Sequence, residues 1–279
     1  MKSEGYELAQ WEQSVETWTR NTDRIERLTA DATAALLARL QPRPGQRLLD
    51  FAAGSGDPSL QLAQLVGPTG HVLATDGVRE MLAVLERRAA ELHLGNLSVL
   101  HAPAEELALP EASFDGACSR FGIMFFPHPP RALARIHRAV RPGGRVAVAA
   151  WGAREKNPFF TLVFDTLEEL GVPDPAPPEA RTVFEFSEPG KLAATLEAAG
   201  WHDVREEREP MRMPLPGANP DGLLDFLADM SRRTSERLAP LDAATRERAR
   251  QILARRAARY ARTGGMDFPG EVLVASGRA

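Results

Sequence analysis

Five short apolar runs alternate with helix-like segments between residues 47 and 151, and this alternation constrains the fold most strongly. The runs have the length of buried strands and fall at residues 47–51, 71–75, 97–101, 114–119 and 145–151. Segments with helical spacing of apolar residues separate them at 58–66, 78–93 and 129–140. Strands alternating with helices predict a parallel sheet with helices on both faces. Because crossovers are right-handed, we expect an α/β, Rossmann-like doubly wound sheet.

Residues outside this core predict further helices and two more strands. Residues 5–41 have helical spacing, and Pro42 and Pro44 end that segment because proline cannot donate to a helix. After residue 151 the pattern predicts a helix at 191–199, strands at 201–207 and 271–276, and helices within 219–262. We expect the helical block between the two strands to lie above an edge or mouth of the sheet, as a lid.

We expect five segments along the chain. They are an N-terminal helical segment for the lid and pocket (1–43), a ligand-binding Rossmann-like core (44–152), a loop, helix and sixth strand (153–208), a helical lid insertion (209–269) and the last core strand (270–279). The proline-dense stretch from Gly171 to Pro178 predicts a loop.

A glycine turn, Gly54-Ser55-Gly56, follows the first strand almost at once. Open parallel sheets bind ligands at the carboxyl ends of their strands. Glycines let the backbone approach a ligand closely, and the helix after them offers free amides. Asp57-Pro58 has the signature of a helix N-cap followed by proline at the first helical position. We therefore expect a nucleotide-like ligand at this turn.

The residues after the turn distinguish a dinucleotide from S-adenosylmethionine (SAM). A dinucleotide fingerprint requires Gly-x-Gly-x-x-Gly, and Ser59 stands at its third glycine position. Asp57 also places a negative charge where a pyrophosphate requires bare amides, whereas the cationic groups of SAM tolerate it. An NAD(P)-dependent oxidoreductase is therefore the less favoured alternative.

Further motifs follow in order along the core. They are Leu48–Gly56, Val72–Asp76, Ala104-Glu105, Ser113–Asp115 and Arg141–Gly144. The series resembles class I SAM-dependent methyltransferases (methyltransferase type 11), in the ubiquinone/menaquinone-methyltransferase-like branch. The resemblance covers residues 44–152 well and the C-terminal third weakly. It implies a mostly parallel seven-stranded sheet with an antiparallel last strand, N-terminal helices and a helical lid inserted before that strand.

The resemblance also implies which residues bind SAM. Asp50 would lie near the SAM aminium through the turn, and Asp76 would accept both ribose hydroxyls, because a carboxylate offers two acceptor oxygens. Asp76 is equally suited to cap the following helix, and the two roles are compatible. The remaining positions are Ala52, Gly54 and Gly56 along the methionine moiety, Gly77 and Met81 beside the adenine, the Ala104 amide with Glu105 as a second adenine contact, and Ser119 where SAM meets the acceptor.

Two departures from the family pattern stand at these positions. The first departure is Ala52, at a position where relatives often carry glycine. Met81 is not a departure, but a purely structural role in the core would explain it equally well. After the third strand relatives often read Gly-Asp-Ala-Glu, but this chain has Pro103 in place of the aspartate. We therefore expect adenine recognition to depend on the backbone amide of Ala104.

The predicted catalytic residue is His128, which stands just before a helix where relatives commonly carry an acidic residue. A helix N-terminus and apolar surroundings would favour a neutral imidazole, which a general base requires. A base is needed only if the acceptor is still protonated, because methyl transfer depends mainly on alignment and desolvation. The alternative for His128 is a surface helix cap.

Aromatic and apolar residues are expected to enclose the acceptor. They are Tyr6, Trp11 and Trp18 in the N-terminal segment, and Phe121, Met124 and Trp151 at strand ends. As a set they favour a small, partly apolar acceptor over a protein or RNA. Each aromatic taken singly is also compatible with a place in the core.

Charge and composition exclude several other classes. With 34 basic and 38 acidic residues the chain carries a net charge of −4, which does not suit a nucleic-acid binder. The single cysteine, Cys118, excludes an internal disulfide, and Ser119-Arg120-Phe121-Gly122 offers no acids for a catalytic metal. No apolar run has the length of a membrane span and the N-terminus has no apolar signal core, so we expect a cytoplasmic protein.

We therefore expect a SAM-dependent methyltransferase that acts on a small organic molecule and releases S-adenosylhomocysteine. O- or C-methylation is favoured over N-methylation, and a monomer or homodimer is expected. A non-catalytic SAM-binding protein is the other alternative.

Overall fold

The computed structural model describes residues 2–174, 176 and 180–279, and describes side chains from residue 8 onward. The chain divides into two compact units, which we name the helical unit and the sheet unit. The helical unit comprises Met1–Ala30, Ala153–Ala180 and Pro210–Glu271. The sheet unit comprises Asp31–Gly152, Arg181–Glu209 and Val272–Ala279.

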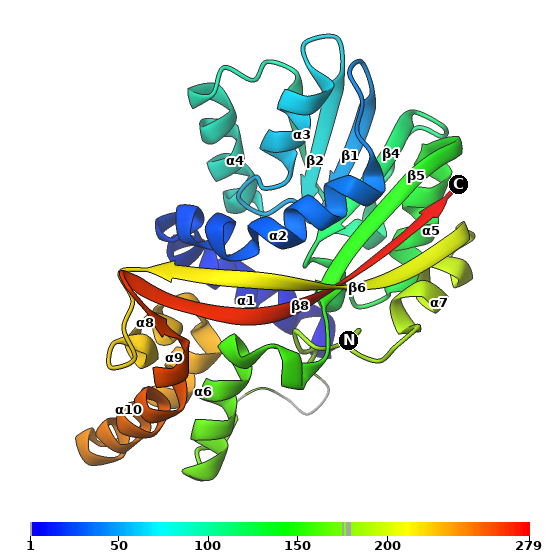
Figure 1. Ribbon diagram of the computed structural model, residues 1–279. Coiled ribbons are helices and arrows are strands. Elements are labelled where there is room, and N and C mark those ends of the chain that lie inside the picture. Colours follow the sequence, from blue (N-terminus) through cyan, green and yellow to red (C-terminus); the bar gives the residue numbers. More distant parts are fainter. Residues whose placement is uncertain (1, 175, 177–179) are drawn as a thin grey trace. The chain divides into compact units, whose positions relative to one another are not determined.

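Helices and strands alternate through the first half of the chain, as the sequence predicts (Figure 1). That half contains α1 (Lys2–Arg20), α2 (Thr22–Leu40), β1 (Arg47–Phe51), α3 (Ser59–Val66), β2 (His71–Asp76), α4 (Arg79–Glu91), β3 (Leu97–His101), β4 (Phe114–Arg120), α5 (Pro129–Ala139) and β5 (Val140–Trp151). The second half contains α6 (Pro158–Glu169), α7 (Lys191–Ala198), β6 (His202–Pro216), α8 (Leu223–Met230), α9 (Arg232–Leu238), α10 (Ala243–Ala257), β7 (Ala261–Arg262) and β8 (Gly265–Arg278).

Eight strands form one sheet in the described part of the chain, in the order β3-β2-β1-β4-β5-β8-β6, with β7 paired to β8. The strands β1 to β5 pair in parallel, and β8 pairs antiparallel to β5. The predicted mostly parallel sheet with an antiparallel last strand is therefore confirmed. The two-residue strand β7 is an addition that the sequence pattern did not indicate.

The strand order explains why helices cover both faces of the sheet. From β1 the chain passes through α3 and α4 to β2 and β3, whereas from β4 it passes through α5 to β5 on the other side of β1. Right-handed crossovers in opposite directions place the helices on opposite faces. The sheet is therefore doubly wound, and its direction changes between β1 and β4.

The core of the sheet unit is formed by the central strands, which are buried on both faces. Leu48 and Leu49 in β1, Val146 to Ala150 in β5 and Val272 to Ala275 in β8 are buried almost completely. Near-continuous apolar runs of this kind are typical of a sheet that has helices on both faces. One of these helices, α5, buries Ala132, Leu133 and Ile136 along one side, as its three- and four-residue spacing requires.

The helical unit has its own apolar interior and its own buried hydrogen bonds. The rings of Phe159 and Phe268 meet edge to face at 5.8 Å. Asn157, which is fully buried, donates from Nδ2 to Ala153 O (2.9 Å) and accepts at Oδ1 from Glu271 N (3.1 Å). This side chain therefore joins the start of α6 to β8 inside the unit.

Several predicted boundaries differ from the structure. The helical pattern of residues 5–41 forms two helices that meet at Asn21, whose Nδ2 donates to Thr17 O and to Asp229. The strands β6 and β8 are longer than predicted, and β5 begins at Val140 instead of at the predicted residue 145. These extensions pass through prolines and glycines, which usually interrupt strands.

Candidate functional site

The carboxyl ends of β1, β2 and β4 lie side by side. In the sheet Asp50 is paired with Ala74 of β2 and with Cys118 of β4. The turn after β1, Asp76 at the end of β2 and Ser119 near the end of β4 therefore share one edge. This is the edge at which open parallel sheets bind ligands.

The turn after β1 has a backbone that favours small residues. Ala52, Gly54 and Gly56 have φ angles of 59°, 55° and 123°, a region that L side chains rarely adopt. A Cβ added to Gly54 would meet nothing within 4 Å, whereas one added to Gly56 would press on Leu60 at 3.1 Å. Gly54 therefore borders open space, and Gly56 is packed against the helix that follows.

Asp76 faces the turn and still has room for two hydrogen-bond donors. Its Oδ2 accepts from Gly54 N and its Oδ1 accepts from Val78 N, both at 2.9 Å. Burial raises the pKa of this carboxyl, and the backbone amides of Gly54, Val78 and Gly77 together with His101 oppose the shift. A carboxylate has about four acceptor positions, so one remains on each oxygen. That remaining capacity fits the two hydroxyls of a ribose, and the bond to Val78 also fixes the start of α4.

Asp50 is fully buried beneath the turn. Its Oδ2 accepts from Ser59 Oγ at 2.5 Å, and the Cys118 thiol lies 3.8 Å from its Oδ1. Burial raises the pKa of Asp50 from 3.8 to about 7, against the opposing effects of Ser59 and Arg120. Burial also raises the pKa of Cys118 well above its ordinary value, so the thiol remains protonated. Any influence of Asp50 on a ligand must pass through the turn.

Asp57 is not the helix cap that the sequence predicts. The N-cap residue of α3 is Pro58, and no side chain donates or accepts a capping hydrogen bond there. Asp57 instead forms an ion pair with Arg120, and the two side chains are only 4% and 7% exposed. Thr33 of α2 bridges the pair, donating to Asp57 Oδ2 (3.0 Å) and accepting from Arg120 Nη1 (2.7 Å).

This ion pair corrects one step of the sequence argument. The negative charge of Asp57 was expected to repel a pyrophosphate, but the guanidinium of Arg120 neutralises most of it. Ser59 remains as the departure from a dinucleotide fingerprint, and its hydroxyl donates to Asp50. Arg120 and Thr33 were not predicted, because their partner is distant in the sequence. The hydrogen bond from Ser59 to Asp50 was not predicted either, although a serine at a glycine position of the fingerprint could have indicated a specific role for this residue.

Two buried hydroxyls at this edge have no hydrogen-bond partner among the described residues. They belong to Thr75, next to Asp76, and to Ser119, and both residues are almost completely buried. A Cβ added to Gly122 would lie 2.9 Å from Ser119 Oγ and 2.4 Å from the Cβ of Ala52. Gly122 therefore accommodates the methyl group of Ala52, and Ser119 lies beside the turn. Unpaired buried hydroxyls are unusual and are compatible with a polar ligand at this edge.

The predicted adenine residues occupy the adjoining ends of β2 and β3. Met81 is buried in α4, and Gly77 O lies 3.0 Å from His101 Nε2. Ala104 is buried at the start of a short 3₁₀ turn. Glu105 Oε1 accepts a hydrogen bond from the backbone N of His128 at 3.1 Å. This carboxylate therefore stabilises the loop before α5.

The predicted catalytic histidine is exposed. His128 precedes α5, and its side chain makes no capping hydrogen bond to that helix. The sequence led us to expect an enclosed imidazole, whereas the structure leaves this residue exposed.

The predicted acceptor residues fall in both units. In the sheet unit Phe121 stacks on Trp151 with ring centroids 4.0 Å apart, and Met124 is fully buried. In the helical unit Trp11 and Trp18 meet edge to face at 5.1 Å. Tyr6 lies in α1, but its side chain is outside the described residues.

Within the described residues there is no group of three or more His, Cys, Asp or Glu side chains that could hold a metal ion. None of the helices described here combines the length and the apolar character that crossing a bilayer requires.

Comparison with protein families gives a match to the ubiE/COQ5 methyltransferase family over residues 26–170. Among curated relatives, the chain is 32% identical to nocamycin O-methyltransferase of Saccharothrix syringae, over 66% of this chain and 69% of that protein. It is 33% identical to the ubiquinone/menaquinone biosynthesis C-methyltransferase UbiE of Methylobacterium nodulans, over 61% of this chain and 72% of that protein.

Solved structures share the fold. A putative methyltransferase of Haloferax volcanii, solved with the Trm112 activator, aligns with a TM-score of 0.59, 19% identity and 96% coverage of both chains. The YcgJ protein of Bacillus subtilis aligns with a TM-score of 0.56 and 18% identity, over 89% of this chain and 98% of that chain.

Proposed function

Because the chain belongs to the ubiE/COQ5 methyltransferase family of SAM-dependent enzymes, we propose that it methylates an oxygen or carbon atom of a small, partly apolar organic molecule. One of the relatives named above is an O-methyltransferase and the other a C-methyltransferase, which supports both atoms as targets. Family membership also sets aside the NAD(P)-dependent oxidoreductase and the non-catalytic SAM-binding protein as alternatives.

The arrangement of Gly54 and Asp76 is the observation that supports the SAM site most strongly. Gly54 borders open space while its amide donates to Asp76. The Asp76 carboxylate has one acceptor position left on each oxygen. We assign the ribose hydroxyls to these positions, and the methionine moiety to the turn formed by Ala52, Gly54 and Gly56.

Further residues of the same edge complete the assignment. Gly77, Met81 and the backbone amide of Ala104 are proposed to border the adenine, with Glu105 as a second contact. The hydroxyl of Ser119, which has no partner in the described structure, is proposed to bind where SAM and acceptor meet. Asp50 would act on the aminium through the turn, because its own side chain is fully buried.

SAM supplies an electrophilic methyl group on a sulfonium for in-line displacement. The residues of the chain would contribute alignment and the exclusion of water. We propose the stacked pair Phe121 and Trp151, with Met124, as part of the acceptor surface in the sheet unit. Trp11, Trp18 and Tyr6 are proposed as the contribution of the N-terminal segment.

His128 remains the proposed general base for acceptors that are protonated at neutral pH. It is the first residue before α5, and its backbone is fixed by Glu105. Its exposure means that a base role requires the acceptor to reach the start of α5.

Two measurements test the proposed function. Titration calorimetry with S-adenosylhomocysteine should give saturable binding to the full chain, weakened about tenfold or more by Asp76→Asn, since a charge-assisted hydrogen bond contributes about 1.5–3 kcal/mol. Glu111→Gln is the matched control, because it removes an exposed carboxylate away from the turn. Unchanged affinity in Asp76→Asn would remove the ribose assignment.

Turnover is then measured with a phenol, a naphthoquinol and a primary amine of similar size. Release of S-adenosylhomocysteine with the phenol or the naphthoquinol is expected. Methylation of the amine alone would contradict the proposed acceptor class while leaving the SAM site intact.

A further inference from the structure

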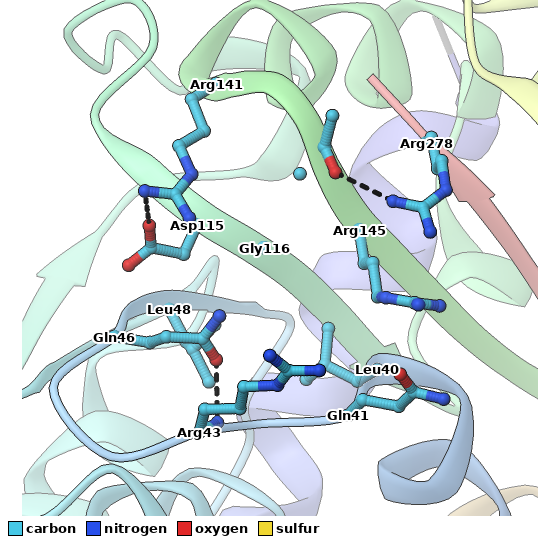
Figure 2. Close-up of a pocket in the computed structure, with 12 residues that line it drawn as sticks. Leu40, Gln41, Arg43, Gln46, Leu48, Asp115, Gly116, Arg141, Arg145 and Arg278 are labelled. Carbon is cyan, nitrogen blue, oxygen red and sulfur yellow. Dashed lines mark hydrogen bonds and ion pairs between the residues drawn. The ribbon is translucent and has the colours of Figure 1, made fainter.

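A cavity lies at the opposite edge of the sheet from the proposed SAM site. Its volume is about 230 Å³, and all the residues around it belong to the sheet unit (Figure 2). Leu48 at the start of β1, Gly116 at the start of β4 and Arg278 at the end of the antiparallel β8 contribute to its walls. Because β8 runs antiparallel to its neighbour β5, its carboxyl end lies at the same edge as the amino ends of the parallel strands β1 and β4. The cavity is therefore separated from the glycine turn by the length of the strands.

Four arginines line this cavity. Arg141 is paired with Asp115, and the other three come from separate segments. Arg43 comes from the segment before β1, Arg145 from β5 and Arg278 from β8 (Figure 2). Arg278 Nη1 donates to Gly143 O at 3.1 Å. Within the described chain, the guanidinium groups of Arg43 and Arg145 have no hydrogen bond or ion pair.

The carboxylate that lines the cavity is already occupied. Asp115 forms an ion pair with Arg141 at 2.5 Å and accepts from the backbone N of Arg47 at 2.6 Å. Asp115 is therefore not available to Arg43, Arg145 or Arg278, and no ion pair forms at these three arginines within the described part of the chain.

The three charges act on one another. Burial together with the charges of Arg278 and Arg43 lowers the pKa of Arg145. Guanidinium groups nevertheless stay protonated in proteins, so the repulsion cannot be relieved by loss of a proton. An anion bound between them would relieve it, and arginine forks match phosphate oxygens in geometry.

We propose that this cavity binds the phosphate end of a small phosphate-bearing molecule. Pockets for drug-sized ligands usually measure about 300–1,000 Å³, so a volume of about 230 Å³ suits one or two phosphate groups better than a whole organic ligand. The site lies outside the proposed methyl-transfer site, and nothing in that reaction requires it.

An adjoining groove provides space for an organic remainder. It shares Gln41, Arg145 and Arg278 with the cavity and has a volume of about 730 Å³. Arg39 lines this groove but is already paired with Glu207 and Glu209. Arg205 lines the groove too, but so do Asp203 and Glu207. The charge of the groove is thus more nearly balanced than that of the cavity, which suits an uncharged or weakly charged portion of the ligand.

The surrounding charge favours a small ligand over a polymer. A nucleic acid or an anionic bilayer requires a broad basic surface, whereas the groove carries Asp203 and Glu207 and the chain has a net charge of −4. The arginines that converge without an ion-pair partner in the described chain, Arg43, Arg145 and Arg278, lie around one cavity.

The test is calorimetric titration of the full chain with inorganic pyrophosphate and with inorganic phosphate, at low salt and without magnesium. Pyrophosphate is expected to bind saturably. Arg145→Gln and Arg43→Gln should each weaken it about tenfold or more, because each removes a charge-assisted hydrogen bond. Arg47→Gln is the matched control, because Arg47 is an exposed arginine at the same edge that does not line the cavity, and it should change the affinity less than about twofold.

Binding of S-adenosylhomocysteine by the same variants shows whether they are folded and whether the two sites are separate. It should be unchanged in all of them. Without added anion at low salt, Arg145→Gln should melt at the same temperature as the wild type or higher, because a like charge has been removed.

Three outcomes would overturn the proposal. They are no saturable binding of pyrophosphate, equal losses in Arg47→Gln and Arg145→Gln, or tight binding of RNA or phosphatidylglycerol vesicles without pyrophosphate binding. Adenosine diphosphate distinguishes the source of the phosphate. If adenosine diphosphate binds more tightly than pyrophosphate, the ligand is an organic phosphate that extends into the groove. If it binds equally or more weakly, the ligand is inorganic phosphate or pyrophosphate.

Discussion

Replacement of Asp50 by asparagine tests whether the carboxyl buried beneath the glycine turn is protonated in the folded protein. Asp50 is fully buried, and its pKa is raised by burial from 3.8 to about 7. Between these two values the native state holds a proton that the unfolded chain has released. Stability therefore falls as the pH rises through this window. Asparagine has the same shape and never ionises, so Asp50→Asn should not show this loss.

The size of the effect follows from the shift in pKa. A rise from 3.8 to about 7 is about three pK units, or about 4 kcal/mol at about 1.36 kcal/mol per unit. About two of these units lie between pH 5 and 7. The stability of Asp50→Asn relative to the wild type should therefore increase by about 2–3 kcal/mol over that interval and change little above pH 8.

Urea denaturation at pH 5, 6, 7 and 8 measures this difference. In a background with Trp11 and Trp18 replaced by phenylalanine, the two remaining tryptophans, Trp151 and Trp201, both report on the sheet unit. Glu111→Gln is the control, because it removes an exposed carboxylate. If the stability difference between Asp50→Asn and the wild type does not vary with pH, Asp50 is ionised throughout and the account of its burial is wrong.

Three further substitutions test neighbouring features. Gly122→Ala should cost about 1–3 kcal/mol in urea unfolding, because its Cβ would lie 2.4 Å from that of Ala52; Ala52→Gly in the same chain should recover at least half, and no recovery would refute the steric explanation. Arg120→Met should destabilise the sheet unit by about 3–5 kcal/mol, since it leaves Asp57 buried without its partner, and adding Asp57→Asn should restore part of that loss; a single variant as stable as the wild type would contradict the argument. His128→Ala should lower turnover of a phenolic acceptor about 100-fold with unchanged S-adenosylhomocysteine affinity, and full activity at every pH would remove the base assignment.

The sheet unit was predictable because its local patterns agree with its topology. The strand at Leu97–His101 has the predicted boundaries, and β1, β2 and β4 differ from prediction by one residue at most. In these segments the apolar run, the turn residues and the helix that follows all favour the same structure. The ribose role of Asp76 came from the family resemblance, and the local pattern predicted only its place at a strand end directly before a helix.

Features that depend on distant partners were not predictable. Asp57 resembles a helix cap locally, but its partner Arg120 stands at the end of β4, 63 residues further along the chain. The extension of β6 through residues 208–216 contains Pro210 and Pro214, which normally end a strand, although Met211, Met213 and Leu215 alternate as buried residues. The arginine cavity has no motif at all, because Arg43, Arg145 and Arg278 are brought together by the sheet alone.

A crystal structure of the full chain with S-adenosylhomocysteine tests the central claim most directly. The account predicts that the ligand lies at the carboxyl ends of β1, β2 and β4, with its ribose hydroxyls on Asp76 and its amino-acid portion along the turn from Ala52 to Gly56. A ligand bound elsewhere, or one whose ribose does not contact Asp76, would contradict it.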